Sequence, residues 1–130
     1  MATWDDVRRL ALALPETDEH PSYGGTRAWR VRRRAFVWER PLHGPDLAAL
    51  GDAAPDGPVL GARVPDEGAK QAMIADSPHL FFTTPHFDGY PAVLVRLDEI
   101  GEQELAELVV EAWLDRAPKR LAATWLAART

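Results

Sequence analysis

Five short runs rich in valine and aromatic residues lie between residues 27 and 97, and the connections between them are short or hold one helix. Runs of this length, bounded by proline, glycine and charged residues, are typical of β-strands. The expected strands cover residues 27–32, 35–40, 59–64, 79–84 and 92–97. Such connections favour antiparallel pairing, because a parallel pair needs a longer crossover. The pattern predicts one antiparallel sheet whose strand order follows the chain.

Apolar residues at three- and four-residue spacing predict helices around these strands. The first helix is expected to begin after Thr3, with Thr3 and Asp6 forming a capping box, and to end before Pro15. Residues 102–116 form the clearest helix, with Leu105, Leu108, Val109, Ala112 and Trp113 on its buried face. Further helices are expected at residues 66–76, as one turn at 46–50, and after Pro118, where Leu121, Ala122, Trp125 and Leu126 are expected to be buried.

The order of these elements decides the fold class. A regular alternation of strand and helix, typical of a doubly wound parallel sheet, is missing. We therefore predict an α+β fold of two layers: a five-stranded antiparallel meander sheet with helices packed on one face, in the order α-β3-α-β2-α. The turn of the first hairpin is expected at Arg33–Arg34, and residues 16–25 are expected to form a polar loop.

Length and composition indicate a single domain over residues 1–130, with 46% hydrophobic and 27% charged positions. The longest apolar run, residues 10–14, is far shorter than the ~20 residues that span a bilayer. Without cysteine, disulfides and Cys-ligated zinc are excluded. We expect a cytoplasmic protein without a membrane partner, and either a monomer or a homodimer fits the sequence.

The segment from Phe82 to Val95, Phe-Thr-Thr-Pro-His-Phe-Asp-Gly-Tyr-Pro-Ala-Val-Leu-Val, resembles the MmcQ/YjbR family. Matching segments elsewhere are Tyr23-Gly-Gly before Trp29-Arg-Val31, Glu111-Ala-Trp113, and Ala117-Pro-Lys-Arg120. The resemblance covers nearly the whole chain. It implies the layout predicted above and a DNA-binding role, the label commonly given to the family, and it brings no established catalytic residues. This sequence has Arg33-Arg34 where the family usually has a glycine and a lysine.

The first hairpin carries the basic residues. The net charge of the chain is −5, which argues against nonspecific coating of DNA, but residues 27–40 hold six arginines and one acidic residue. Guanidinium groups suit phosphate, and a two-stranded ribbon fits the major groove. The candidate DNA-contacting residues are Arg27, Arg30, Arg32, Arg33 and Arg34. As alternatives, these arginines protect a sheet edge from pairing, or they pair with the acidic helix face at 104–115.

The connection at residues 83–91 offers a second candidate site. His86, Asp88 and Tyr90 are hydrogen-bonding groups, and an imidazole near a carboxylate is able to act as a general base. These residues predict a site for a small molecule or an anion, and an enzyme is the more distant possibility. The alternative is a structural turn in which Asp88 caps backbone N–H groups and Gly89 is left-handed. The acidic helix face at 104–115 leaves open a protein-interaction module.

Motifs for metals and cofactors are missing. His20, His43, His79 and His86 form no pair at helical i, i+4 spacing, and no glycine-rich phosphate loop occurs. We therefore expect neither a metal site nor a cofactor. The five tryptophans are expected in the core, except that Trp38 alternates onto the same side as Arg40 and is expected to be partly exposed.

Overall fold

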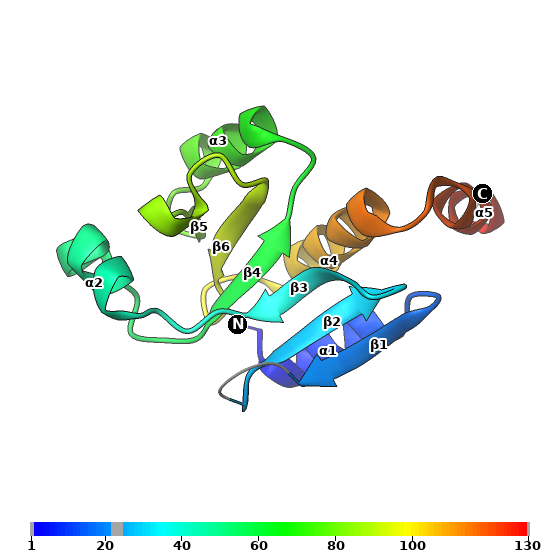
Figure 1. Ribbon diagram of the computed structural model, residues 1–130, viewed down its shortest axis with the longest axis horizontal. Helices are drawn as coiled ribbons and strands as arrows, with labels where there is room; N and C mark the ends of the chain where they lie inside the picture. Colours follow the sequence, from blue (N-terminus) through cyan, green and yellow to red (C-terminus); the bar gives the residue numbers. More distant parts are fainter. Residues whose placement is uncertain (1, 22–24, 130) are drawn as a thin grey trace.

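The computed structural model describes residues 2–21 and 25–129 and confirms the α+β class with an antiparallel sheet (Figure 1). The strands are β1 (Thr17–Pro21), β2 (Arg27–Val31), β3 (Arg34–Glu39), β4 (Val59–Arg63), β5 (Phe81–Phe82) and β6 (Ala92–Arg96). The α-helices are α1 (Trp4–Leu12), α2 (Gly44–Leu50), α3 (Glu67–Asp76), α4 (Glu102–Arg116) and α5 (Lys119–Ala128), and two short 3-10 helices are η2 (Gly51–Ala53) and η3 (Pro85–Phe87). Ser22, Tyr23 and Gly24, the last two part of the family resemblance, lie outside the described residues.

The sheet has six strands where five were predicted, because residues 17–21 form β1 and not a loop. β1 pairs with β2 along its whole length, from Thr17 opposite Val31 to Pro21 opposite Arg27. Its sequence is Thr-Asp-Glu-His-Pro, without a fully buried side chain. A strand at the sheet edge that buries neither face carries none of the apolar alternation by which strands are recognised.

The strand order is β1-β2-β3-β4-β6-β5, so the predicted meander is wrong at its last step. β4 pairs with β6, where Leu60 lies opposite Val95, and the two-residue strand β5 forms the far edge. The connection from β4 to β5 contains α3, which gives the chain enough length to pass β6. A segment predicted as six residues of strand thus supplies only a short edge.

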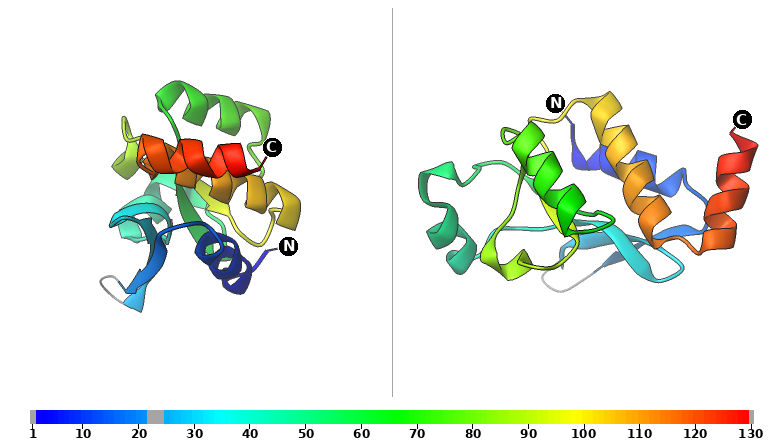
Figure 2. Two further views of the ribbon diagram at one scale, coloured as in Figure 1. Left: turned by 90° about the vertical axis from the view of Figure 1, so that its right-hand side faces the viewer. Right: turned by 90° about the horizontal axis from the view of Figure 1, so that it is seen from above.

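The main core lies between one face of the sheet and helices α1 and α4, which run side by side (Figure 2). All five residues of the predicted α4 stripe are buried, and Trp29 and Trp113 are the largest fully buried side chains. A second apolar cluster lies on the opposite face of β4, β5 and β6; its members are Val59, Phe82, Phe87, Ala92 and Leu94. Leu50 of α2 packs against the edge of that second cluster, while α1 and α4 form the predicted helix layer on the other face.

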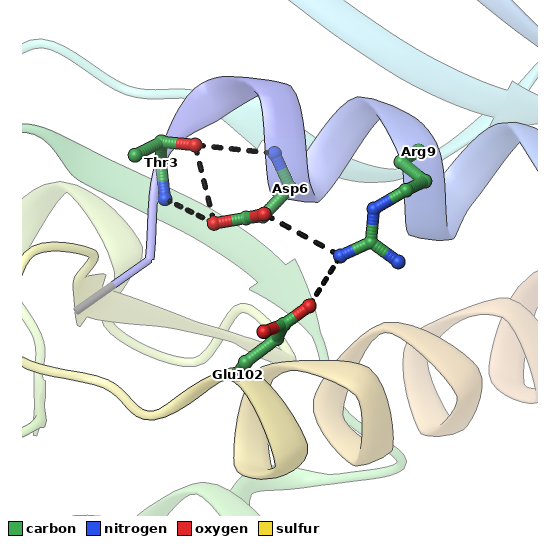
Figure 3. A network of polar contacts seen from close by, with 4 residues as sticks. All are labelled: Thr3, Asp6, Arg9 and Glu102. Atoms are coloured by element: carbon green, nitrogen blue, oxygen red, sulfur yellow. Dashed lines mark hydrogen bonds and ion pairs between the residues drawn. The ribbon is translucent and has the colours of Figure 1, made fainter.

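Polar contacts at the start of α1 confirm the predicted capping box (Figure 3). The Asp6 N–H donates to Thr3 Oγ1 (3.3 Å), and the Thr3 N–H donates to the Asp6 carboxylate (2.9 Å). Arg9 Nη2 contacts both Asp6 (3.4 Å) and Glu102 (2.6 Å). The network fixes the beginning of α1 beside the beginning of α4, although such exposed ion pairs add little stability.

The predicted last helix is present as α5, but the burial predicted for it is too high: three of the four residues are partly buried, and the fourth is exposed. The Trp125 ring lies 5.3 Å from the Trp113 ring, and Leu121 and Ala122 pack against the core. Leu126 is 47% exposed. It follows Trp125 by one residue, so it is turned about 100° around the helix axis, away from the face that packs.

The β2–β3 turn occupies Arg32 and Arg33, one residue earlier than predicted. Both residues have positive φ, 47° and 70°. Two-residue hairpin turns of the common primed type need positive φ at both central positions, which favours asparagine and glycine. A side chain with a Cβ in this left-handed region costs of order 1 kcal/mol. The hairpin tip is therefore strained.

Replacing Arg33 with glycine is expected to raise the free energy of unfolding by about 1 kcal/mol, because glycine adopts positive φ without that steric cost. Urea titration measures the change, and the slope of the transition should stay constant. Arg34→Gly is the matched control. Arg34 begins β3, so glycine there should lower the free energy of unfolding by about 0.5–1 kcal/mol. An equal decrease in the free energy of unfolding in both variants would contradict the conclusion that the turn is strained at Arg33.

Candidate functional site

Three of the five arginines proposed to contact DNA are already paired with carboxylates. The contacts join Arg27 to Glu39 (3.0 and 3.1 Å), Arg30 to Asp18 (2.9 and 3.1 Å) and Arg32 to Glu16 (2.5 and 3.1 Å). Hydrogen bonds from Arg30 and Arg32 hold the pKa values of Asp18 and Glu16 below their usual range. The alternative prediction, that these arginines pair with the acidic face of α4, is therefore wrong for all three. β2 is also an internal strand, so they do not protect an edge.

Arg33 and Arg34 differ from the other hairpin arginines. Both are exposed, and their side chains have no ion pair or hydrogen bond within residues 2–21 and 25–129. They lie at the hairpin tip, beside the C-terminal end of α4 (Figures 1 and 2). Among the five predicted residues, these two are the ones able to meet a phosphate without first losing a protein partner.

The loop at residues 83–91 is held from inside the protein by Lys70 of α3. The Lys70 side chain is 1% exposed, and its Nζ donates to the carbonyl oxygens of Phe87 (2.7 Å) and Tyr90 (3.2 Å). Glu67 lies 3.5 Å from the same Nζ. A buried ammonium needs such partners, because desolvating an unpaired charge is costly. Lys70 shapes the loop, and we did not predict this role.

The position of Lys70 in the sequence indicates that its side chain is buried. Lys70 lies three and four residues before Met73 and Ile74, on one face of α3 that packs against the core. A lysine at an apolar position of a helical stripe indicates a buried ammonium with fixed partners.

The structure brings together two of the three residues predicted in this loop, His86 and Tyr90, and leaves Asp88 apart from them. His86 and Tyr90 lie on either side of Phe87, with ring centroids 4.9 and 6.1 Å from it. Asp88 is exposed and lines none of the hollows described below. Gly89 is left-handed as predicted, with φ 75°. The predicted capping role of Asp88 is wrong, because no backbone N–H among the described residues donates to its carboxylate. Glu67 accepts a hydrogen bond from Gln71 (2.8 Å), which together with the charge of Lys70 lowers the pKa of Glu67.

An ion pair between Arg40 and Asp46 lies beside the loop. Arg40 Nη2 donates to Asp46 Oδ2 (3.0 Å), and the two side chains are 11% and 5% exposed. Arg40 also donates to the Pro41 carbonyl, and its guanidinium carbon lies 5.2 Å above the Phe87 ring. Burial raises the pKa of Asp46, but the His43 N–H and Arg40 outweigh it, so the pKa is lowered. No sequence motif predicted this ion pair.

Asp46→Asn is expected to lower the free energy of unfolding by about 2 kcal/mol at pH 7, because the amide keeps the acceptor for His43 but removes the charge that faces Arg40. A carboxyl group whose folded pKa is lowered stabilises the fold at neutral pH and loses that effect in acid. The difference between the two proteins should therefore shrink below pH 3.8, the ordinary value for the group. Urea unfolding at pH 7 and pH 3 measures it, and a constant difference would contradict the pairing.

Two hollows share Arg40 and His86. One, of about 520 Å³, is lined by Arg40, His43, Pro45, Asp46, Pro85 and His86. The other, of about 390 Å³, is lined by Trp38, Arg40, His86, Phe87 and Tyr90, and we call it the aromatic pocket. Volumes of 300–1,000 Å³ and aromatic linings are typical of small-molecule sites. The pocket brings together residues 38–40 and 86–90, a juxtaposition that sequence spacing does not reveal.

Trp38 forms one wall of the aromatic pocket, partly exposed as predicted. Its indole lies against Gly61 of the neighbouring strand, where a Cβ would collide with the ring. In the part of the chain that the structure describes, the indole N–H, the His86 imidazole and the Tyr90 hydroxyl have no hydrogen-bond partner. The pocket therefore offers flat apolar surfaces together with free polar atoms.

The described residues contain neither a metal-binding cluster nor a membrane-spanning helix. Among residues 2–21 and 25–129, no group of three or more histidine or acidic side chains is placed to hold a metal ion. No helix in the same residues is long and apolar enough to cross a membrane.

Comparison with known proteins identifies the family. The YjbR family model matches residues 12–114, which include β1 to β6 and nearly all of α4. The chain belongs to the YjbR family. The chain is also similar to the uncharacterized proteins Rv2570 of Mycobacterium tuberculosis and Mb2600 of Mycobacterium bovis: each is 54% identical over 130 residues, and the match covers 98% of both sequences.

A solved structure supports the fold of this YjbR protein. The crystal structure of Deinococcus radiodurans protein DR2400, described as a DUF419 domain, matches with a TM-score of 0.64 at 22% identity. The match covers 88% of this chain and 78% of that chain. At this identity the similarity concerns the fold, and function rests on the site itself.

Proposed function

We propose that this YjbR protein is a binding protein for a small planar ligand, which occupies the aromatic pocket. The observation that carries the proposal is the set of four ring-bearing side chains, Trp38, His86, Phe87 and Tyr90, gathered around Arg40 in a hollow of about 390 Å³. Stacked or edge-to-face ring contacts stabilise a planar guest beyond simple area burial. The free indole N–H, imidazole and phenol supply the polar contacts that fix its orientation.

The indole N–H signals of the five tryptophans provide a test specific to this pocket. In ¹H–¹⁵N spectra, the signal lost in Trp38→Phe belongs to Trp38. The probes are adenosine, guanosine, nicotinamide and indole-3-carboxylate, each titrated separately. At least one probe is expected to shift the Trp38 signal while the Trp113 signal, from a fully buried ring, stays in place.

Gly61→Ala disrupts one pocket wall without replacing a lining residue, because the new Cβ displaces the Trp38 ring. The shift is expected to disappear in this variant. Gly101→Ala is the matched control, since a Cβ there meets nothing within 4 Å and φ is −75°. A panel in which no probe moves the Trp38 signal, or a shift that survives in Gly61→Ala, contradicts the proposal.

DNA binding through the hairpin is a second candidate, supported by the two exposed arginines at its tip. Neither Arg33 nor Arg34 forms an ion pair with a carboxylate among the described residues, unlike the three paired arginines behind them. Binding of duplex DNA at low salt is expected to weaken in Arg33→Ala/Arg34→Ala, and the slope of log K against log salt should fall by about 1.8, or 0.9 for each lost phosphate contact. Absence of wild-type binding at about 50 μM protein and low salt contradicts this candidate.

A further inference from the structure

A hollow of about 380 Å³, separate from the aromatic pocket, is lined by residues of α3, β5 and α4. We call it the acidic hollow, because Glu104, Glu107 and Glu111 line its α4 side at three- and four-residue spacing. The apolar residues that line it are Val64, Pro65, Ala69, Met73, Phe81 and Leu108. All three glutamates are exposed, and none of them forms an ion pair with another described residue.

Arg63 also lines the acidic hollow, but its charge already has other partners. Its Nε lies 3.3 Å from Asp115 Oδ2, and its guanidinium carbon lies 5.2 Å from the centre of the Tyr90 ring. The row of glutamates therefore lies beside apolar side chains without a paired cation. A surface that complements this hollow combines apolar side chains with adjacent positive charges.

The last helix, α5, presents such a surface. Residues 117–130 carry three positive charges and no acidic residue, in a chain whose net charge is −5. No residue of α5 is buried, and the helix lies beyond the C-terminal end of α4 (Figures 1 and 2). Ala123, Leu126 and Ala127 are exposed and follow Lys119 at helical spacing, so they share one face with it. Arg120 is exposed beside that face.

The α5 helix of the same chain does not fill the acidic hollow. None of its residues lines the hollow, and Trp125 packs instead against Trp113, near the end of α4. The lengths nevertheless match: the ten residues of α5 extend about 15 Å, and the row from Glu104 to Glu111 extends about 10 Å. An α5 helix from a second copy is therefore long enough to cover all three glutamates.

We propose that the protein forms a two-fold dimer in which α5 of each copy lies in the acidic hollow of the other. Leu126, with the small residues Ala123 and Ala127, contacts the apolar lining, and Lys119 and Arg120 face the glutamates. Two identical contacts related by a two-fold axis close the assembly. Because each contact involves one short helix, we expect a weak dimer, with a dissociation constant of about 10–100 μM.

Sedimentation velocity of the full chain between about 5 and 500 μM tests the proposal, and the mass is expected to rise from one chain to two. Two charge-reversal variants should each weaken the dimer at least tenfold, because like charges then face one another. The hollow variant is Glu107→Lys/Glu111→Lys, and the α5 variant is Lys119→Glu/Arg120→Glu. All four positions are exposed, and acidic residues at a helix N-terminus are favourable, so both variants should fold normally.

Mixing the two variants tests the exchange of α5 between copies. In a mixed dimer, the new lysines of one hollow face the new glutamates of the other copy's α5, and the second contact has its native charges. The mixture should therefore dimerise about as tightly as the wild type. Asp52→Lys/Asp88→Lys, at exposed positions that do not line the hollow, is the control for the hollow variant. It changes the net charge equally and should leave the dimer intact.

Met73 provides a probe inside the acidic hollow. The chain has two methionines, Met1 and Met73, so the methyl signal that is lost in Met73→Leu belongs to Met73. In ¹H–¹³C spectra of the wild type, this signal is expected to shift as the protein is concentrated over the same range. It should stay in place in the α5 variant, which keeps every residue that lines the hollow.

Three results would overturn the proposal. One is a wild-type protein that remains monomeric at about 500 μM. Another is a dimer that forms without moving the Met73 signal, or that the α5 variant leaves intact. The third is a mixture of the hollow and α5 variants that remains monomeric while both proteins give the circular dichroism of the wild type.

Discussion

Trp113→Ala is expected to lower the free energy of unfolding by about 3–5 kcal/mol. Trp113 is fully buried, and its indole N–H donates to the Pro15 carbonyl (3.2 Å), which ties α4 to the segment that follows α1. Removal of the ring opens a cavity between α4 and the sheet and leaves that carbonyl without its donor. Because small domains are stable by only about 5–15 kcal/mol, this is a large share of the total.

Urea unfolding followed by circular dichroism measures the Trp113 effect, with the midpoint moving and the slope unchanged. Trp125→Ala is the control, because its ring lies against Trp113 at the edge of the core and is partly exposed. Its loss should be about half as large or less. A change below about 1 kcal/mol in Trp113→Ala would show that the α4 stripe does not form the core.

Helices and strands with a strong local periodicity of apolar residues are the ones that the sequence predicts correctly. The bounds of α4 agree with the predicted 102–116 because four turns of apolar residues repeat on one face. β1 was missed because an edge strand that buries neither face needs no such pattern. The order of β5 and β6 was wrong because strand order depends on how α3 crosses the sheet, which local sequence does not encode.

The candidate site was predicted only in part for a related reason. His86 and Tyr90 were identified from one loop, and they do line the same pocket. The other walls come from Trp38 and Arg40, and the pocket depends on Gly61 of a third segment, so its members become neighbours only through sheet register. The arginines of the hairpin had an obvious charge pattern, but Asp18, the partner of Arg30, lies on β1, the strand that was not predicted, and Glu16, the partner of Arg32, lies directly before it.

Lys70→Met should lower the free energy of unfolding by about 3 kcal/mol, because the thioether fills the space of the lysine stem but donates no hydrogen bond. The carbonyl groups of Phe87 and Tyr90 then lose a charged donor, and hydrogen bonds to charged groups contribute roughly 1.5–3 kcal/mol each, partly offset by the desolvation of the ammonium. The effect should be local as well as global. Tyr90 and His86 depend on the shape of this loop, so the aromatic pocket should lose its ordered wall.

Two measurements separate these consequences. Urea unfolding gives the global loss, and native-state hydrogen exchange should show faster exchange at the Phe87 and Tyr90 amides while the amides paired between β4 and β6 stay protected. Lys119→Met, at the exposed start of α5, is the control and should change stability by less than about 0.5 kcal/mol. Unchanged exchange in the loop of Lys70→Met would show that Pro85, Gly89 and Pro91 fix its conformation without the buried ammonium. Faster exchange, with weaker binding of the planar probes, would place Lys70 as the residue through which α3 positions Tyr90 and His86.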